Sequence, residues 1–229
     1  MENNDNYNQP TSIVFLLGEA GSGKDSIGKI LVEEHGYTRV SFADAVKDEV
    51  AKLHDMDVKL LHEQGPVKEK MRSAMIELAE NERAKDPLHW LKLAFLKHQD
   101  EEFNFKPGLK LVITDCRRDS EIDWLYALKQ EIYVANTQSQ GRAQHYVFPY
   151  LFLVKRDNKP IDTDVLTHGC ISYAMGIQKV LHEKTLMTHN DIRLLDGFVH
   201  NNGTIDNLKS KIQAVVENFN LNHIYKEIE

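Results

Sequence analysis

Short apolar runs of strand length alternate along the chain with longer segments of helical period. The clearest run is SIVFLLG, residues 12–18, which is continuously apolar and ends in glycine. Similar runs occupy residues 38–42, 109–117 and 150–156, and a last one, within LLDGFVHNNG, ends at residue 201. A continuous apolar run is typical of a strand that is buried on both faces of a parallel sheet. The pattern therefore predicts about five buried strands.

The segments between these runs carry apolar residues at helical spacing. Ile27, Ile30 and Leu31 predict a helix that ends at Gly36. Residues 44–98 are charged and helical in pattern, and prolines at positions 66 and 87 mark helix starts. Further helices are predicted after residue 117 and after Thr204, which has the side chain of a helix cap.

Strands separated by helices, without tight hairpin signals, predict an α/β fold with three layers and a parallel sheet flanked by helices. We expect a polar tail over residues 1–11 and one domain over residues 12–229. Residues 130–148 are compatible with an extra strand or with an inserted helix and loop. Residues 157–191 are long for a connection between strands and are expected to form a lid insertion with helices of its own.

Composition limits the classes of function. The chain of 229 residues is 41% hydrophobic and 28% charged, and no apolar run approaches the roughly 20 residues of a membrane span. The net charge of −7 argues against a nucleic-acid partner, so any anionic ligand must be held by a local group of cations. The polar N-terminus and only two cysteines favour a cytoplasmic protein, with no membrane partner.

The stretch LLGEAGSGKDS contains the most informative motif. Gly18, Gly23 and Lys24 satisfy the pattern G-x-x-x-x-G-K, with Gly21 adding freedom to the loop. Backbone N–H groups of such a loop and the N-terminus of the following helix bind phosphate oxygens, and the lysine reaches the β and γ phosphates. The preceding buried strand and the following helix are the context that this motif requires. The alternative is a glycine-rich turn with a surface lysine.

Acidic residues near the loop predict a magnesium site. Asp25 stands where phosphate loops usually carry Ser or Thr, and Ser26 is a neighbouring hydroxyl. Asp115 ends an apolar run, which places it at the carboxyl end of a strand, where ligands of open α/β sheets bind. Carboxylates are good ligands for Mg²⁺. In the alternative interpretation, Asp25 only complements the helix dipole.

Arginines and lysines supply candidate phosphate contacts. Arg117 and Arg118 follow Asp115 directly, and Arg156 stands at the entrance to the expected lid, where it could close on the transferred phosphoryl group. The helical region contributes further basic candidates, each with a salt bridge on its own helix as the alternative: Lys47, Arg72 and Arg83. The histidines show no pair of metal ligands at helical spacing, and Cys116 is expected to be a core residue.

Several motifs together are similar to those of known kinases. LLGEAGSGKDS, SFADAVKDE, RAKDPLHW, VITDCRRDSEI and GFVHNNGTIDNL resemble the phage-type deoxynucleoside monophosphate kinases, in which G-K-D replaces G-K-S or G-K-T. KEKMR, ERAKDP and TDCRRDSEIDW resemble animal-type phosphomevalonate kinase, of the same P-loop superfamily, at least as closely. The nucleotide kinase is preferred here for the length of the chain and its HNNGTIDNL segment. The segment EKTLMTHND lacks an expected lid motif, so lid contacts are not carried over.

The resemblance implies transfer of the γ-phosphoryl group of ATP, with Mg²⁺, to a small-molecule phosphate acceptor, a deoxynucleoside monophosphate, by a monomer or homodimer. It implies that residues 18–26, including Ala20, Gly21 and Ser22, hold ATP, and that Asn201, Asn202 and Gly203 border the adenine. The region from Asp44 to Arg83 would bind the acceptor, with Asp115 and Arg117 between the two substrates. A non-catalytic ATP-binding module remains the alternative of another class.

Overall fold

The computed structural model describes residues 10–99, 104–138, 147–157, 170–175 and 195–222. The chain forms two compact units. The first contains Met1–Arg39 and Phe105–Glu229, and the second contains Val40–Asn104. Each unit is described separately.

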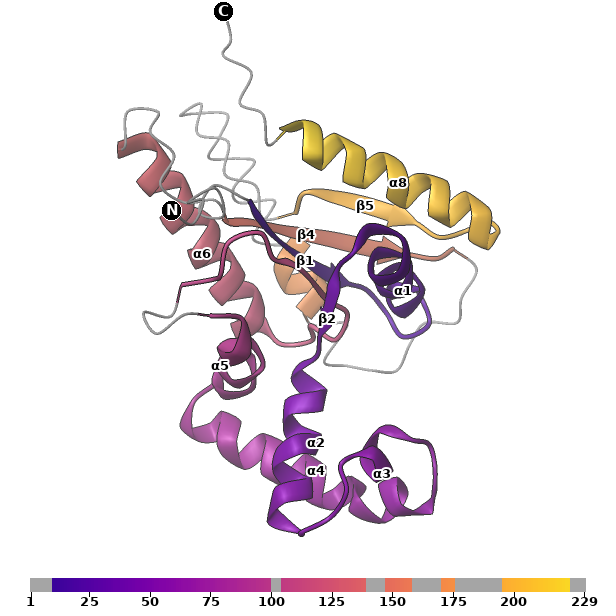
Figure 1. Ribbon diagram of the computed structural model, residues 1–229, viewed down its shortest axis with the longest axis vertical. Coiled ribbons are helices and arrows are strands. Elements are labelled where there is room, and N and C mark those ends of the chain that lie inside the picture. The colour runs from indigo at the N-terminus through magenta and orange to yellow at the C-terminus, as the bar shows by residue number, and fades with distance from the viewer. Residues whose placement is uncertain (1–9, 100–103, 139–146, 158–169, 176–194, 223–229) are drawn as a thin grey trace, which may run out of the picture. The chain divides into compact units, whose positions relative to one another are not determined.

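The first unit is built on a five-stranded sheet with the order β2-β3-β1-β4-β5 (Figure 1). Strand β1 (Thr11–Leu17) is central, and all seven of its residues are buried. It pairs in parallel with β3 (Lys110–Ile113) on one side and with β4 (Val147–Lys155) on the other, and β4 pairs in parallel with β5 (Gly197–His200). The short strand β2 (Thr38–Val40) lies at the far edge. The predicted parallel sheet of about five strands is confirmed.

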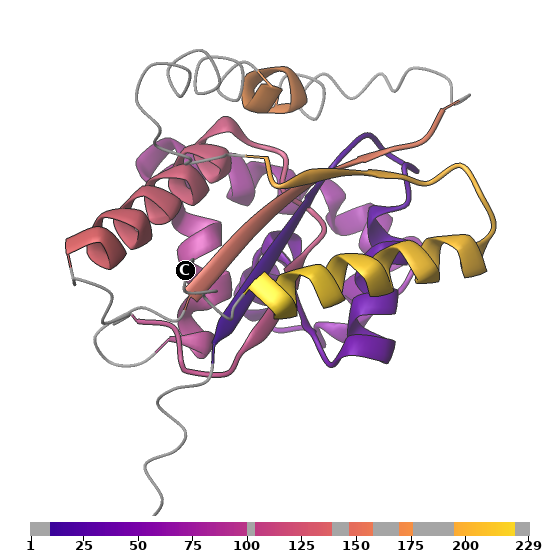
Figure 2. The same ribbon diagram turned by 90° about the horizontal axis from the view of Figure 1, so that it is seen from above.

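Helices cover both faces of this sheet, as Figure 2 shows in a view from above, with α6 (Asp119–Gln138) on one side of the strands and α8 (Ile205–Asn222) on the other. Helices α1 (Lys24–His35) and α8 contribute apolar side chains to a cluster that includes Val14, Leu16 and Phe152. On the other face, α6 packs Trp124 against Phe15, with 6.2 Å between the ring centres. Alternate residues of β1 thus face different helices, which produces the three predicted layers.

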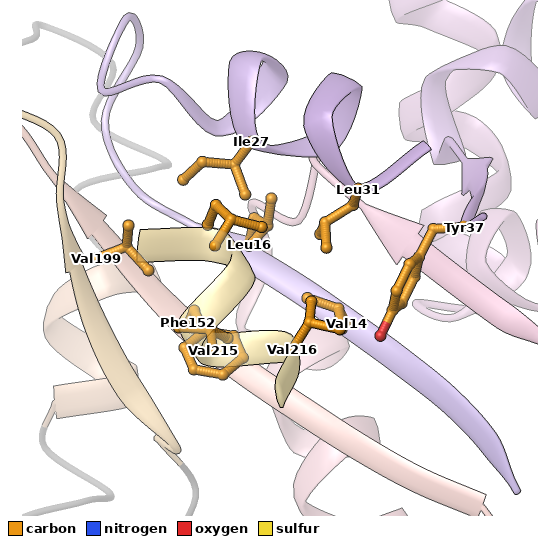
Figure 3. Close-up of a pocket in the computed structure, with 10 residues that line it drawn as sticks. Val14, Leu16, Ile27, Leu31, Tyr37, Phe152, Val199, Val215 and Val216 are labelled. Atoms are coloured by element: carbon orange, nitrogen blue, oxygen red, sulfur yellow. The ribbon is translucent and has the colours of Figure 1, made fainter. Parts of the chain in front are cut away.

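The core between β1, α1 and α8 is closely packed (Figure 3). A gap of about 10 Å³ remains among Leu16, Ile27, Phe152, Val199 and their neighbours. A gap of this size is at the lower limit for a single water molecule, and its lining is almost entirely apolar. It is therefore a packing gap and not a ligand site.

Local signals explain several helix ends. Helix α1 ends at Gly36, whose φ of 72° is left-handed and whose N–H donates to the carbonyl of Leu31. Helix α8 is capped by Thr204, because its Oγ1 accepts a hydrogen bond of 3.3 Å from the N–H of Asn207. Both ends are where the sequence predicts them.

The second unit contains α2 (Phe42–Leu53), α3 (Lys59–His62), α4 (Pro66–Lys85), α5 (His89–Phe95) and the 3₁₀ turn η2 (Leu96–His98). The indole N–H of buried Trp90 donates to the carbonyl of Ala79 at 3.0 Å and joins α5 to α4. Phe42 and Phe95 meet edge to face, which joins α2 to α5. The predicted helical region is therefore a small helical unit with its own core.

Several predicted boundaries differ from the structure. Strand β2 ends at Val40, because the Ser41 hydroxyl caps α2 by accepting from the N–H of Asp44 and Phe42 is already helical. Strand β3 ends at Ile113 and does not reach Arg117. Strand β1 begins at Thr11, which was assigned to the tail.

Of the two ambiguous segments, residues 130–138 continue helix α6, and β4 begins at Val147; residues 139–146 lie outside the described residues. Within the expected lid, residues 170–175 are helical and most of the remainder lies outside the described residues. Within the described parts of the chain, no helix has the length and apolarity of a membrane span.

Candidate active site

The glycine loop, residues 18–26, joins the carboxyl end of β1 to the first turn of α1, as the motif predicts. Gly18, Gly21 and Gly23 all have positive φ, and the N–H of Ser22 donates to the carbonyl of Glu19 at 3.1 Å. The loop therefore curls back on itself before the helix begins at Lys24. N–H groups at the start of the 12-residue helix α1 add the positive end of a helix dipole to this loop.

Lys24 is not the surface lysine of the alternative interpretation. Its side chain is 7% exposed, and its ammonium group donates to the carbonyl of Gly18 and, at 2.8 Å, to that of Glu19. The positive charge is therefore held against the loop itself. A polyphosphate in the loop would offer the ammonium stronger, charged acceptors than these two carbonyls.

Other segments of the first unit closely approach both glycines of the G-x-x-x-x-G-K motif. A Cβ atom on Gly18 would lie 2.4 Å from the carbonyl oxygen of Val154, at the end of β4. A Cβ atom on Gly23 would lie 2.1 Å from Nδ2 of Asn201, just after β5. Since real Cβ contacts are never this short, side chains are excluded at both positions in this arrangement.

The predicted magnesium ligands lie near each other in the fold. Asp25 and Ser26 are exposed in the first turn of α1, and Asp115 is half-buried after β3. The two elements touch where a Cβ on Gly28, one turn after Asp25, would lie 2.6 Å from the methyl group of Thr114. Two carboxylates and a hydroxyl are a suitable set of hard oxygen ligands for Mg²⁺. Within the described ranges no group of three or more His, Cys, Asp and Glu side chains forms a metal cluster, so a metal here would also need phosphate oxygens.

The segment after Asp115 is organised by Glu121, a residue that the sequence analysis did not single out. Its Oε2 accepts the backbone N–H groups of Arg117 at 2.7 Å and Arg118 at 3.1 Å, at the start of α6. Glu121 is the third residue of this helix, so it acts as half of a capping box. Its side chain is buried, which raises its pKa, as does the charge of Asp115, while the two N–H donors lower it. Backbone orientation at both arginines therefore depends on this carboxylate.

Cys116 lies in the same segment and is completely buried. A hydrogen bond with the Cys170 thiol, followed by burial, raises the pKa of Cys116 well above its usual value. The thiolate is therefore strongly disfavoured at neutral pH. This agrees with the predicted core role.

A cavity of about 190 Å³, the loop-side cavity, opens beside the glycine loop. Its walls come from the loop, from the end of β4 and from the helical residues 170–175: Glu19, Ser22, Leu153, Val154, Lys155, Arg156, Asp157 and Ile171. Arg156 is exposed on this wall, and the hydroxyl of Ser22 is buried without a hydrogen-bond partner. The structure thus brings the predicted arginine together with the loop.

Asn201, Asn202 and Gly203 follow β5 and lie on the loop side of the sheet, but only Asn201 is buried. Its side-chain amide donates to the carbonyl of Ser22 at 2.9 Å. Asn202 is exposed and exchanges hydrogen bonds with Asp157. Contacts of this segment with adenine stay a prediction.

The basic candidates of the second unit form salt bridges within their own helices, which is the alternative to acceptor binding that the sequence left open. Lys47 contacts Asp44 at 2.6 Å, and two more pairs have the same i, i+3 spacing: Arg72 with Glu69 at 3.7 Å and Arg83 with Glu80 at 3.0 Å. The side chain of Arg72 is 69% exposed, whereas those of Lys47 and Arg83 are 17% and 22% exposed. Binding of an acceptor by these residues stays a prediction.

Comparison with known proteins gives a match at the level of a family. The family model of phosphomevalonate kinase matches residues 16–131, about half of the chain. A phosphomevalonate kinase of Drosophila melanogaster is 29% identical over 114 residues, which cover 49% of this chain and 58% of the fly protein. The matched range contains the glycine loop, Asp115, Arg117 and Arg118, and it ends before Arg156 and Asn201.

Solved structures give weaker likenesses. A putative kinase from Chloroflexus aurantiacus has 14% identity and a TM-score of 0.41, with 93% of this chain and 98% of that chain covered. A dephospho-CoA kinase from Campylobacter jejuni has 11% identity and a TM-score of 0.39, with 91% and 98% covered. Shikimate kinase from Acinetobacter baumannii has 10% identity and a TM-score of 0.36, with 95% and 97% covered. The strand order β2-β3-β1-β4-β5 and the glycine loop after β1 define the fold.

The family match begins at Leu16, near the end of β1, and spans the glycine loop, helix α1 and the segment that begins at Asp115. By that match the chain belongs to the phosphomevalonate kinase family.

Proposed function

We propose that this protein is a kinase that transfers the γ-phosphoryl group of ATP to a phosphate group of a small molecule, and that phosphomevalonate is the first acceptor to test. The observation that carries the proposal is the geometry of the glycine loop, with the buried Lys24 ammonium on the carbonyls of Gly18 and Glu19. A buried lysine held inside a curled loop at a helix N-terminus is suited to polyphosphate and to few other ligands.

In the proposed reaction, an oxygen of the acceptor phosphate attacks the γ-phosphorus of ATP and the bond to the β–γ bridging oxygen breaks, so that ADP leaves. Loop N–H groups hold the phosphates, and Lys24 moves from the loop carbonyls to the phosphate oxygens. Arg117, Arg118 and Arg156, among the described residues of the first unit, are the cations that we propose to surround the transferred group. Mg²⁺ held by Asp25, Ser26 and Asp115 would neutralise charge on the phosphates.

The acceptor proposed from the comparisons differs from the one preferred from the sequence. The resemblance to nucleotide kinases favours a deoxynucleoside monophosphate, whereas the family model and the fly relative both favour phosphomevalonate. Since the chain covers only 58% of that relative, its activity is not transferred as a whole. The deoxynucleoside monophosphates therefore serve as the comparison arm of the experiment.

The decisive experiment measures ADP release in a coupled assay. Wild-type protein is incubated with Mg·ATP and phosphomevalonate, mevalonate or each of the four deoxynucleoside monophosphates. We expect turnover with phosphomevalonate and none with mevalonate, since the acceptor oxygen belongs to a phosphate. Stimulation by a nucleotide alone would favour the other kinase class.

Two variants test whether the site acts as proposed. Lys24→Ala should lower turnover by about 100-fold or more, because the lysine stabilises charge that develops on the transferred group. Asp115→Asn should give a similar loss while ATP still binds. ATP binding by wild type without phosphoryl transfer to any acceptor would instead indicate the non-catalytic module.

A further inference from the structure

Asn201 joins three parts of the first unit at one point. Its side-chain amide donates to the carbonyl of Ser22 in the glycine loop at 2.9 Å, and its backbone N–H donates to the carbonyl of Lys155 at 2.8 Å. Asn201 is 9% exposed, so the amide bond to the loop is shielded from water. The end of β5 is thereby tied both to the end of β4 and to a loop that lies 179 residues away from it in the chain.

The partner of Asn201 in the loop is a peptide group with two functional ends. The peptide between Ser22 and Gly23 is trans and planar, so its carbonyl and its N–H point in opposite directions. Asn201 fixes the carbonyl end, which directs the Gly23 N–H to the opposite side. The next peptide is fixed too, because the carbonyl of Gly23 accepts the N–H of Ile27 at 2.9 Å and begins α1.

The absence of a side chain at Gly23 makes this contact possible. A Cβ there would lie 2.1 Å from the donating nitrogen of Asn201. The glycine of the motif therefore serves two purposes: it adopts a φ of 106°, and it leaves the space that the Asn201 amide occupies. The amide is consequently part of the support of the loop.

On these grounds, and resting on the proposed function, we propose that Asn201 is a positioning residue for ATP. Through the Ser22 carbonyl it holds the Ser22–Gly23 peptide in the orientation that offers the Gly23 N–H to a phosphate oxygen. It acts on the phosphates and not on the adenine ring. This differs from the role that the resemblance implies for residues 201–203.

Two ligands separate these roles. Dissociation constants are measured for ATP and for inorganic tripolyphosphate, which has the phosphates without adenine. If Asn201 acts through the loop, Asn201→Ala should raise the dissociation constants of both ligands by a similar factor of about ten, which is the effect of one misplaced hydrogen bond to a charged group. A contact with adenine predicts weaker ATP and unchanged tripolyphosphate, and that result would overturn the proposal.

A second variant adds a pH signature. In Asn201→Asp the ionised carboxylate places an acceptor against the Ser22 carbonyl, so both ligands should bind weakly at pH 8. As pH falls toward 5, the protonated acid can donate to that carbonyl, and affinity for tripolyphosphate should recover relative to Asn201→Ala at each pH. Absence of recovery counts against the proposal. If Asn201→Asp is too unstable to study at pH 8, the comparison of ATP with tripolyphosphate in Asn201→Ala still decides between the two roles.

The matched control is Asn207→Asp, the same chemical change at an exposed residue in the first turn of α8. We expect its affinities to stay within twofold of wild type and to show no pH recovery. Steady-state kinetics add a further check: Asn201→Ala should raise KM for ATP by about tenfold and leave KM for the acceptor unchanged.

The outcomes also separate this proposal from the proposed function. If wild type binds ATP and tripolyphosphate but transfers to no acceptor, the kinase assignment fails and the role of Asn201 is still decided by the binding data. If wild type binds neither ligand, the loop is not a phosphate site and the role of Asn201 is overturned.

Discussion

The contact between Gly23 and Asn201 makes a quantitative prediction about stability. Gly23→Ala has two separable costs. An alanine forced to a φ of 106° costs about 1–3 kcal/mol of backbone strain. Its Cβ also displaces the Asn201 amide, which leaves the buried Ser22 carbonyl without its donor at a further cost of about 1–3 kcal/mol.

A double-mutant cycle isolates the second cost. Asn201→Ala loses the same hydrogen bond and should destabilise the protein by about 1–3 kcal/mol. Because the double variant loses that bond only once, its destabilisation should fall short of the sum of the two single variants by about 1–3 kcal/mol. The measurement is urea unfolding of all four proteins by circular dichroism, with m-values compared.

Gly36 supplies the matched control for this cycle. It also has positive φ, at 72°, but a Cβ there would meet no atom within 4 Å. Gly36→Ala should therefore show strain alone and combine additively with Asn201→Ala, within about 0.5 kcal/mol. Additive behaviour of the Gly23 and Asn201 variants would refute the reasoning, since it would mean that the two residues do not compete for one space.

Three further predictions concern the helices around the site. Gly28→Ala gains about 1 kcal/mol of helix propensity, but its Cβ would lie 2.6 Å from the Thr114 methyl group, so we expect a net loss of stability. In urea unfolding, the second change Thr114→Ser, which removes that methyl group, should restore the lost stability. A Gly28→Ala variant as stable as wild type would contradict the close contact. Lys129→Met removes the ion pair, at 2.5 Å, between the Lys129 side chain, which is 9% exposed, and Asp196, and should cost about 1–2 kcal/mol, because Asp196 keeps the hydrogen bond from the Leu151 N–H. Burial lowers the pKa of Lys129 in the folded protein, so at a pH between the folded and unfolded pKa values the unfolded chain binds more protons than the folded one. The free energy of unfolding of wild type, relative to that of Lys129→Met, should therefore rise with pH just below 10.5. A difference that does not change with pH would refute this assignment. Asp25→Ser should raise the Mg²⁺ concentration for half-maximal turnover by several-fold and change KM for the acceptor little, whereas equal effects on both would contradict a metal role.

The sheet and the glycine loop could be predicted because their signals are local. Residues 12–18 are continuously apolar, and the structure buries every residue of β1. Gly18, Gly23 and Lys24 lie within seven residues of each other, so one short motif predicts the end of a strand, a loop and the start of a helix. The helix ends at Gly36 and Thr204 were predictable for the same reason, since each is capped by a residue within a few positions.

The errors arose where two local signals compete. Residues 38–42 have the composition of a strand, but SFAD also has a hydroxyl three residues before Asp44, and that cap ends the strand at Val40. Glu121 was missed although it stands at the third position of a helix, where a carboxylate can accept N–H groups of the preceding residues. The usual capping-box pattern does not reveal it, because Arg118 and not a Ser, Thr, Asp or Asn stands three residues before Glu121.

Roles that depend on tertiary pairing could not be read from the sequence. Asn201 looked like part of an adenine-binding segment, because nothing near it in the chain indicates Ser22 as its partner. The contact arises only when β4 lies between β1 and β5, as the sheet order requires. Lys47, Arg72 and Arg83 were left with two interpretations, and the structure shows each of them in an ion pair on its own helix without showing whether it binds an acceptor.

The support of the glycine loop lies largely outside the range that identifies the family. The family match ends at residue 131, yet β1 pairs along its whole length with β4, which begins at Val147. The carbonyl of Val154 and the amide of Asn201, both beyond the match, occupy the spaces left by Gly18 and Gly23. Gly18 and Gly23 must therefore lack side chains because of residues in the part of the chain that the match does not cover. If the loop binds phosphate as proposed, changes at the ends of β4 and β5 should therefore alter that binding without touching any residue of the motif.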